Sequence, residues 1–312
     1  PLSRLPYRAA IVLYALLLVA ALGLGLWLLG GAFPLLAEQR GPALALALAC
    51  YPLTRSVAGG QNTALSLFLL AASLALLLRP PTRGRELGAG FLLGLLASKP
   101  TLGLPFLGLA LLLRRPWVAV GGGAGLGAVY GASAWVSGWA WPAAWWARVS
   151  TWRGPEALRN GEDLISLAGV GEQAFGSPGA WLGLGLSGLV VTGLIVLFWR
   201  RGRSDLAGCW GVAIAGVLLL SPHTQFYEAG LLVLPGWLIA ARQGPQAKTW
   251  LAGLFLLAWS HGLTPYLPLQ PLFVLTLLVG WVALRRVRAE AGPACPALDP
   301  QEELRPSPGP LP

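Results

Sequence analysis

Long apolar runs, separated by short segments that contain arginine, constrain the fold of this chain more than any other feature. About 20 apolar residues in a helix cross a bilayer, and 55% of the residues are hydrophobic while 11% are charged. We therefore expect an all-α, polytopic transmembrane helix bundle over residues 1–288. A disordered, proline-rich cytoplasmic tail is expected over residues 289–312. The eight expected spans are 9–32, 61–78, 117–138, 180–199, 206–222, 225–241, 249–264 and 269–285.

Two apolar segments, 42–54 and 87–113, do not fit a single full crossing. The second consists of two half-length runs that meet at Lys99-Pro100. Each half would be roughly 18 Å long as a helix, which is too short for a hydrocarbon core of about 30 Å. We expect a hairpin of short helices that enters and leaves on one side. The alternative is one long, kinked helix, which would invert the topology of everything after it.

The distribution of basic residues favours the hairpin with residue 1 in the cytoplasm. In that arrangement 16 of the 22 lysines and arginines lie on the cytoplasmic side, as the positive-inside rule predicts. The net charge of +10 is then explained by topology and by anionic lipid headgroups, and nucleic acid is not an expected partner. The six basic residues left outside are Arg40, Arg55, Lys99, Arg148, Arg153 and Arg159.

Lys99 is the residue most indicative of function. The chain has two lysines, and Lys248 lies in a polar linker, whereas Lys99 interrupts an apolar stretch. A cation at membrane depth is costly and indicates a functional site that meets an anion. The other interpretation is that Lys99 extends to the outer interface and has only a structural role.

The same topology places several other polar groups on the outer side. Gln61 and Asn62 open a helix, where Asn62 or Thr63 could act as a cap. His223, Tyr227 and Glu228 follow Ser221-Pro222, and their alternative role is a polar turn that caps a helix. The expected outer loop, 139–179, contains five tryptophans together with Arg148, Arg153 and Arg159; it reads equally as an interfacial aromatic belt and as a lid over a lipid substrate.

Other candidate groups carry less weight. His261 lies near the outer end of its span without polar company and is interpreted as structural. Glu156, Glu162 and Asp163 read as solvated charges. The three cysteines have no spacing typical of disulfides or metal sites, and no metal or nucleotide motif is present, so no cofactor is expected.

Three motifs in order resemble glycosyltransferase family 87, within the C-type superfamily of membrane glycosyltransferases. They are Gly60-Gln61-Asn62, Lys99-Pro100, and Ser221-Pro222-His223 followed by Tyr227-Glu228. The resemblance implies inverting transfer of a hexose, typically mannose, from a polyprenyl-phosphate donor to a glycolipid or glycan acceptor. It implies a multi-pass protein of the cytoplasmic (inner) membrane, with the active site on the extracytoplasmic face.

The resemblance also suggests roles for individual residues. Lys99, assisted by Arg148 and Arg153, would bind the donor phosphate, and Gln61, Asn62 and Tyr227 would contact the sugar. His223 and Glu228 would be catalytic. The family's general base is an aspartate in the first outer loop, which would precede Pro1, so the chain is expected to be truncated at its N-terminus and inactive as given. Glu38 is a second, weaker candidate for a base.

Two alternatives remain open from the residues. A transporter or flippase for a phosphate-bearing lipid would also use broken helices and a Lys–His–Glu set, although both interrupted segments lie in the first half of the chain. A non-catalytic assembly subunit would use the tryptophan-rich loop for contacts.

Overall fold

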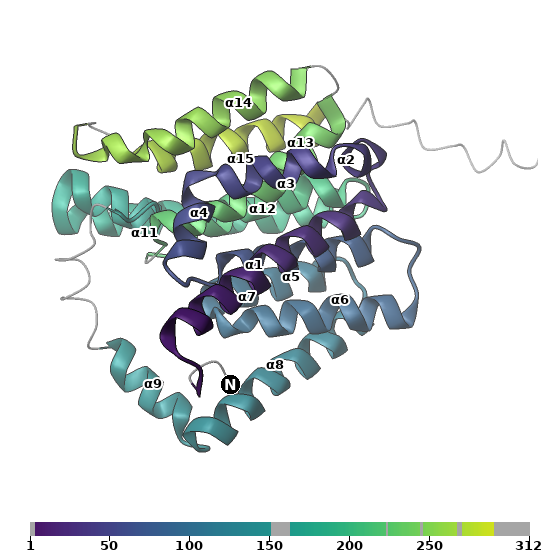
Figure 1. The fold of residues 1–312 in the computed structure, drawn as a ribbon, viewed down its shortest axis with the longest axis vertical. Coiled ribbons are helices and arrows are strands. Elements are labelled where there is room, and N and C mark those ends of the chain that lie inside the picture. The colour runs from purple at the N-terminus through teal and green to yellow at the C-terminus, as the bar shows by residue number, and fades with distance from the viewer. Residues whose placement is uncertain (1–3, 151–162, 223, 244–245, 267–269, 290–312) are drawn as a thin grey trace, which may run out of the picture.

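The computed structural model describes residues 4–150, 163–222, 224–243, 246–266 and 270–289, and each named element in those ranges is a helix (Figure 1). The first half contains α1 (Tyr7–Gly30), α2 (Pro34–Glu38), α3 (Arg40–Ala49), α4 (Tyr51–Ala58), α5 (Thr63–Leu77), α6 (Arg83–Leu95), η2 (Leu96–Ser98), α7 (Pro100–Leu112), α8 (Pro116–Ser137) and α9 (Trp141–Ser150). The second half contains α11 (Leu167–Arg201), α12 (Leu206–Leu220), η4 (Phe226–Leu232), α13 (Val233–Gln243), α14 (Gln246–Trp259), η5 (Ser260–Tyr266) and α15 (Pro271–Ala289). The predicted all-α class is confirmed for this part of the chain.

Two short helices form the centre of the bundle. Twelve of the 15 residues of α5 and 13 of the 15 residues of α12 are buried. In α1, by contrast, six of 24 residues are buried, and large apolar side chains such as Leu16, Leu17 and Trp27 are exposed. A helix that is apolar all round belongs in the interior, so α5 and α12 are the columns on which the other helices pack.

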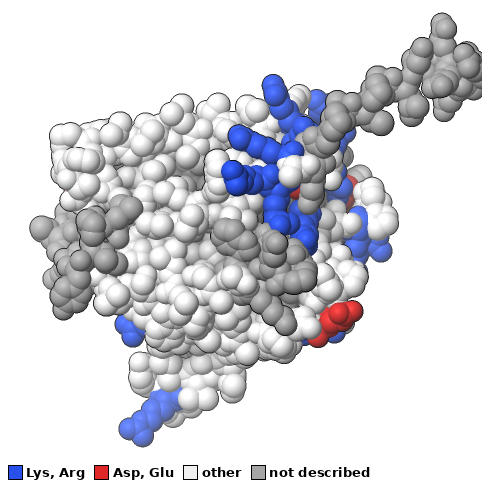
Figure 2. Space-filling view, turned by 90° about the horizontal axis from the view of Figure 1, so that it is seen from above, with Lys and Arg blue, Asp and Glu red and all other residues white. Residues whose placement is uncertain are grey.

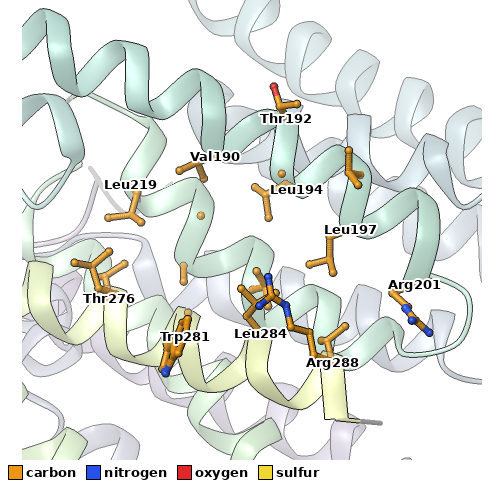
Figure 3. A pocket seen from close by; sticks show the side chains of 18 of the residues that line it. Val190, Thr192, Leu194, Leu197, Arg201, Leu219, Thr276, Trp281, Leu284 and Arg288 are labelled. Carbon is orange, nitrogen blue, oxygen red and sulfur yellow. The ribbon is translucent and has the colours of Figure 1, made fainter. Parts of the chain in front are cut away.

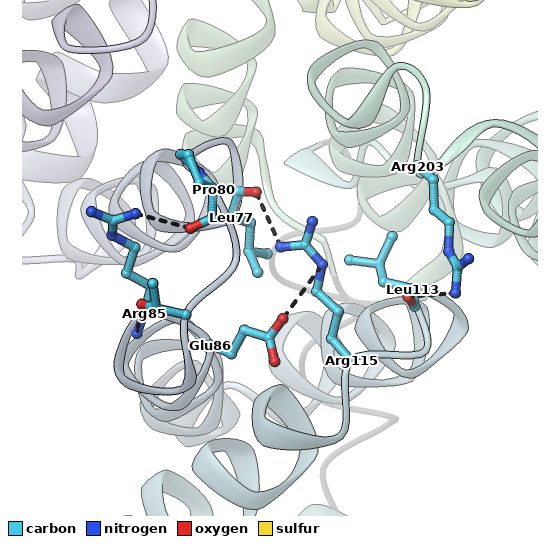
Figure 4. A network of polar contacts seen from close by, with 8 residues as sticks. Leu77, Pro80, Arg85, Glu86, Leu113, Arg115 and Arg203 are labelled. Atoms are coloured by element: carbon cyan, nitrogen blue, oxygen red, sulfur yellow. Dashed lines mark hydrogen bonds and ion pairs between the residues drawn. The ribbon is translucent and has the colours of Figure 1, made fainter.

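Most of the basic residues gather at one end of the molecule, which we call the arginine end (Figure 2). There Arg115 bridges helix ends by donating to the carbonyl oxygen of Leu77 at 3.1 Å, and it pairs with Glu86 at 3.8 Å (Figure 4). Arg242 pairs with Asp205 at 2.8 Å, while Asp205 caps α12. Arginines that satisfy carbonyls and carboxylates at helix ends hold the connections together.

The first helices run differently from the predicted topology. Gly25 of α1 lies against Ala71 of α5, and Gly31 lies against Arg79, so α1 and α5 are parallel. The expected arrangement, with residue 1 on the same side as the arginine-rich linkers, would have made them antiparallel. This prediction was wrong: α1 begins at the opposite end of the molecule, which we call the lysine end because Lys99 lies there, and finishes at the arginine end.

The segment 42–54 explains the error. Gly30 lies against Arg40 and Gly23 against Leu44, so α3 runs back alongside α1 from the arginine end. Cys50 is extended, with ψ 119°, and α4 follows it to the lysine end, where Leu53 packs on Gly230 of η4. The segment is therefore part of a broken return path, and it is not a short element confined to the outer side. Pro52 indicated a boundary in the sequence because proline in the interior of a helix breaks or kinks it.

The predicted reversal at Lys99 is found. Close contacts of Gly90 with Val118 and of Gly94 with Gly125 make α6 and α8 parallel, so α7 between them must return to the arginine end. A Cβ on Gly94 would lie 2.4 Å from the carbonyl oxygen of Gly122, which shows why this seam is built from glycine. The chain thus reverses at Lys99 instead of continuing as one kinked helix.

The helix α11 contains a second reversal that the sequence analysis did not anticipate. Gly176 has φ 65°, which favours glycine, and the residues on its two sides fold against each other. A Cβ on Gly179 would come within 1.9 Å of the carbonyl oxygen of Gly171. The expected span 180–199 is the longer arm of this hairpin.

The number of membrane crossings is not settled by helix length. Among the described residues, α1 and α11 are long and apolar enough to cross a membrane, and the pair α4–α5, bent by 118°, would add a third if it were one span. Other apolar helices, such as α7 and α12, have 13 and 15 residues. The protein is an apolar membrane helix bundle, but the predicted count of eight full spans is not confirmed.

Candidate active site

Lys99 lies at the tip of the α6–α7 hairpin. Its backbone is extended, with φ −111° and ψ 91°, between the short helix η2 and Pro100, which begins α7. Proline suits the first position of a helix and forces the preceding residue out of the helical conformation. A Cβ on Gly103 would lie 2.4 Å from the backbone nitrogen of Ala97, so this glycine lets α7 fold closely against η2. These residues produce a sharp reversal with Lys99 at its tip.

Glu228 comes from the other half of the chain. It lies in the first turn of η4, where its backbone N–H donates to the carbonyl oxygen of Gln225 at 2.9 Å. Gly230 follows two residues later and packs directly on Leu53 of α4. This contact fixes η4 across the lysine end of the bundle and holds Glu228 over the tip of the α6–α7 hairpin.

Lys99 and Glu228 form an ion pair. The distance from Lys99 Nζ to Glu228 Oε1 is 3.1 Å, and the two side chains are 20% and 21% exposed. The ring of Tyr227 lies 6.0 Å from the same Nζ, at the edge of cation–π range. The sequence placed these three residues on one face, and the structure brings them together across 129 positions. A half-buried pair retains enough exposure for an anionic ligand to compete for the lysine.

The ion pair is set back from the ends of two flanking helices. Gly25 of α1 is level with Ala71 of α5, so the first ten or so residues of α1 extend roughly 15 Å past the start of α5. By the same reasoning, from the contact of Gly94 with Gly125, α8 continues about 10 Å beyond the level of Lys99. Measured along the bundle, Lys99 and Glu228 are therefore recessed from the ends of α1 and α8.

Gln61 and Asn62 also lie at the lysine end, before the first residue of α5, which packs against η4. Gly60, with φ +68°, makes the turn, and the Gln61 N–H donates to the carbonyl oxygen of Ser56 at 2.8 Å. The expected side-chain cap is not found, since Asn62 makes no capping hydrogen bond. Instead the Thr63 hydroxyl is buried without a hydrogen-bond partner. In the described structure Gln61 and Asn62 make no hydrogen bond to Lys99 or Glu228.

The turn before η4 contacts the end of the loop that follows α9. Thr224 donates its hydroxyl to the carbonyl oxygen of Ser221 at 3.1 Å, and its own carbonyl accepts the N–H of Ile165 at 2.9 Å. Beside Glu228, a small cavity is lined by Thr101, Leu102, Val217, Leu218, Ser221, Thr224 and Leu231. His223, predicted to be catalytic, lies outside the described residues, as do Arg153 and Arg159.

Sequence reasoning missed an aromatic cluster next to Glu228. His261 stacks on Phe226 at 4.9 Å between ring centroids and lies 5.6 Å from the ring of Tyr51. Its Nε2 is 3.7 Å from Asp163 Oδ1. His261 was expected to be structural and without polar company, whereas it supports the residue two positions before Glu228 and contacts a carboxylate. The sequence carries no signal for this, because the partners lie far apart in the chain.

Two other candidates are not brought to the ion pair. Arg148 is exposed in the last turn of α9, which packs on the far end of α8 (Figure 1). Glu38 ends α2 next to the last turn of α1, and so lies at the arginine end. Glu38 therefore lies at the opposite end of the bundle from the Lys99–Glu228 pair and is not placed to act as a base beside Lys99. Within the described ranges, no group of three or more His, Cys, Asp or Glu is arranged to hold a metal.

A recessed cation held by a carboxylate, at the tip of a broken-helix hairpin, is suited to a reaction in which negative charge develops on an anionic group. The glycosyltransferase family 87 model matches residues 1–222, whereas no curated protein and no solved structure matches the chain. The match includes Lys99 and the hairpin that carries it, and it ends shortly before Glu228. Because the matched region covers more than half of the 312 residues, the chain belongs to glycosyltransferase family 87 and is a membrane glycosyltransferase.

Proposed function

We propose that this glycosyltransferase moves a hexose, and specifically mannose, from a polyprenyl-phosphate donor to a glycolipid or glycan acceptor with inversion at the anomeric carbon. The observation that carries the proposal is the Lys99–Glu228 pair, 3.1 Å apart and recessed at the lysine end. A sugar nucleotide would present its phosphates in water. A polyprenyl phosphate holds its phosphate at the membrane surface, which suits a cation flanked by apolar helices.

The chemistry requires one bond to form and one to break. The acceptor hydroxyl oxygen attacks the anomeric carbon, the bond from that carbon to the phosphate oxygen breaks, and the electron pair stays on the phosphate. Lys99 stabilises the charge that develops on the leaving phosphate. A carboxylate takes the hydroxyl proton.

Glu228 has a defined part in this scheme. Before the donor binds, it keeps the half-buried Lys99 paired. When the donor phosphate replaces it on Lys99, the carboxylate becomes available to accept a proton from the acceptor. His223, which is five residues before Glu228, is proposed to donate a hydrogen bond to the phosphate. Gln61, Asn62 and Tyr227 are proposed to contact the sugar, and Arg148 and Arg153 to assist at the phosphate through the segment that contains α9.

The proposed face is extracytoplasmic. The arginine end carries most of the cations, and the positive-inside rule places such an end in the cytoplasm. The lysine end then opens to the outer side of the cytoplasmic (inner) membrane. This orientation rests on the linkers after α5, because the start of α1 lies at the lysine end.

The test is a transfer assay with the full-length protein in liposomes, using radiolabelled polyprenyl-phosphate mannose and an extract of membrane glycolipids. We expect Lys99→Gln and Glu228→Gln to lower transfer strongly and Lys99→Arg to retain part of it, while thermal unfolding in detergent changes little. Equal transfer by wild type and Lys99→Gln would overturn the role of the pair. Movement of labelled lipid between leaflets without any glycosylated product would instead establish the flippase alternative.

A further inference from the structure

A large groove lies far from the Lys99–Glu228 pair, and nothing in the proposed reaction uses it. It is a groove of about 750 Å³ between α11, α12 and α15 (Figure 3). Its walls are apolar over most of their length, with Leu194, Leu197 and Leu219 on one side and Leu277 and Leu284 on the other. This volume is within the range of small-molecule sites, which are about 300–1,000 Å³.

The groove has one polar end. Arg200, Arg201 and Arg288 line it where α11 and α15 finish, at the arginine end of the molecule. In Figure 3 the side chains of Arg201 and Arg288 lie at the same end of the groove, away from Thr276 and Leu219. No Asp or Glu is among the lining residues. The groove therefore pairs a long apolar wall with a cationic end that has no carboxylate within it.

The dimensions match one leaflet of a bilayer. From Thr276 to Arg288 the helix α15 rises about 18 Å, a little more than half of a hydrocarbon core of about 30 Å. The cationic end lies at the level of the arginine-rich linkers, where lipid headgroups lie. Trp281 lines the groove between these ends, and its ring lies 5.1 Å from the Arg285 guanidinium.

From these observations we infer that the groove binds an anionic membrane phospholipid. Its phosphate meets Arg200, Arg201 and Arg288, and an acyl chain lies along α11 and α15. The site is separate from the donor site, because its charged end lies at the arginine end and the Lys99–Glu228 pair lies at the opposite one. The bound lipid would cover the gap between α11 and α15, both of which pack on α12.

Glycine provides a way to fill the groove without changing charge. Gly193 lines it, and a Cβ at that position meets no atom within 4 Å, so a larger side chain fits the backbone and occupies the space of the lipid chain. Gly185, on the same helix, also has open space around its Cβ position but does not line the groove. Gly193→Leu and Gly185→Leu are therefore matched variants, of which only the first places a side chain in the groove.

The experiment is native mass spectrometry of the delipidated full-length protein, titrated with phosphatidylglycerol or with phosphatidylcholine of the same chain length. We expect phosphatidylglycerol to bind tightly to one site. The triple change Arg200→Gln, Arg201→Gln and Arg288→Gln should weaken binding at least tenfold, since each cation near an anionic lipid contributes about 1 kcal/mol. Gly193→Leu should reduce occupancy to a similar extent.

The controls distinguish effects on folding, on surface charge and on the groove itself. Arg83→Gln with Arg85→Gln removes charge from the same end outside the groove, and it should leave binding within about twofold, as should Gly185→Leu. Equal binding of the two lipids by wild type would overturn the inference. So would loss of binding in the triple arginine variant without loss in Gly193→Leu, because that result would show attraction of charge to the surface and no occupied groove. Since binding is read without any transfer reaction, failure here is distinct from failure of the proposed enzyme function.

Discussion

The two ends of the bundle use positive charge in different ways. At the arginine end, Arg115 donates to the carbonyl oxygen of Leu77 and Arg203 donates to that of Leu113, so these cations complete helix ends (Figure 4). At the lysine end, Lys99 instead extends from a helix break to a carboxylate of a distant segment. The first arrangement stabilises connections, and the second keeps a cation ready for an anionic ligand.

The cations at the two ends differ in whether their partner can be replaced by a ligand. A carbonyl oxygen at a helix end is held in place by the backbone, so an arginine bound to it is a permanent part of the fold. Glu228 is a side chain on a short 3₁₀ helix and can give up Lys99 to a phosphate. Four sets of variants test whether the cations at the two ends differ in this way.

Lys99→Gln should change the rate of sugar transfer more than any other variant, and Arg115→Gln is its counterpart at the arginine end. We expect Lys99→Gln to slow transfer by about 100-fold or more, comparable to the removal of one group that stabilises developing charge. Arg115→Gln should change the rate less than about threefold. The measurement is initial transfer velocity in liposomes with equal amounts of folded protein. A slow Arg115→Gln enzyme would show that both ends act in the reaction.

The next effect concerns the glycine seam between α6 and α8, which supports the hairpin that carries Lys99. Gly94→Ala places a Cβ 2.4 Å from the carbonyl oxygen of Gly122 and should cost about 1–3 kcal/mol of unfolding free energy. Gly127→Ala, on the outward face of α8, meets nothing within 4 Å and should be neutral or slightly stabilising. Thermal unfolding in detergent compares them, and equal midpoints would contradict the close packing of α6 on α8.

Charge reversal separates the structural and functional parts of the ion pair. Lys99→Glu faces Glu228 with a second carboxylate and should destabilise the fold by about 2 kcal/mol, less than for a fully buried pair. Adding Glu228→Lys should recover most of the lost stability. It should not recover transfer, because the cation then lies on the wrong segment. Unfolding midpoints and transfer rates measured on both variants give the answer. Recovery of full activity in the double variant would mean that transfer depends only on the presence of an ion pair and not on which segment carries the cation.

The smallest effect is expected for stability at the arginine end. Arg115→Gln removes the bond to the Leu77 carbonyl and the pair with Glu86, whose atoms are 3.8 Å apart, and should cost about 1 kcal/mol. Arg83, which lies over the Trp117 ring at 3.9 Å but makes no such bridge among the described contacts, is the control. Should Arg83→Gln be the more damaging change, the helix-end bonds would not be the stabilising element.

Part of the candidate site was predictable from the sequence. Lys99-Pro100 between two half-length apolar runs indicated a reversal, and that reversal is found because proline and the short helix lengths act locally. The sequence also predicted that Lys99 and the motif at Ser221-Pro222-His223 lie on one face. The structure pairs Lys99 with Glu228, close after that motif, at 3.1 Å and places the Tyr227 ring 6.0 Å from the Lys99 Nζ. The roles assigned to His223, Arg148 and Arg153 remain predictions.

Other parts could not be read from local patterns. The direction of α1 was mistaken because the break at Cys50 and Pro52 resembled the end of an element, whereas packing carries α3 and α4 back along α1. The contacts of His261 with Phe226 and Asp163 depend on segments about 35 and 98 residues away, so no spacing rule reveals them.

An apolar helical bundle with a break at Lys99 follows from local properties of the chain, because the length of an apolar run and the position of a proline act through the solvent and the backbone. Which helix ends meet depends on packing between distant segments. This packing paired Lys99 with Glu228, placed Glu38 at the opposite end from both, and opened a groove between α11 and α15. These outcomes depend on which helix faces fit closely enough to pack, and glycines such as Gly94 and Gly230 set that fit only when their distant partners are present.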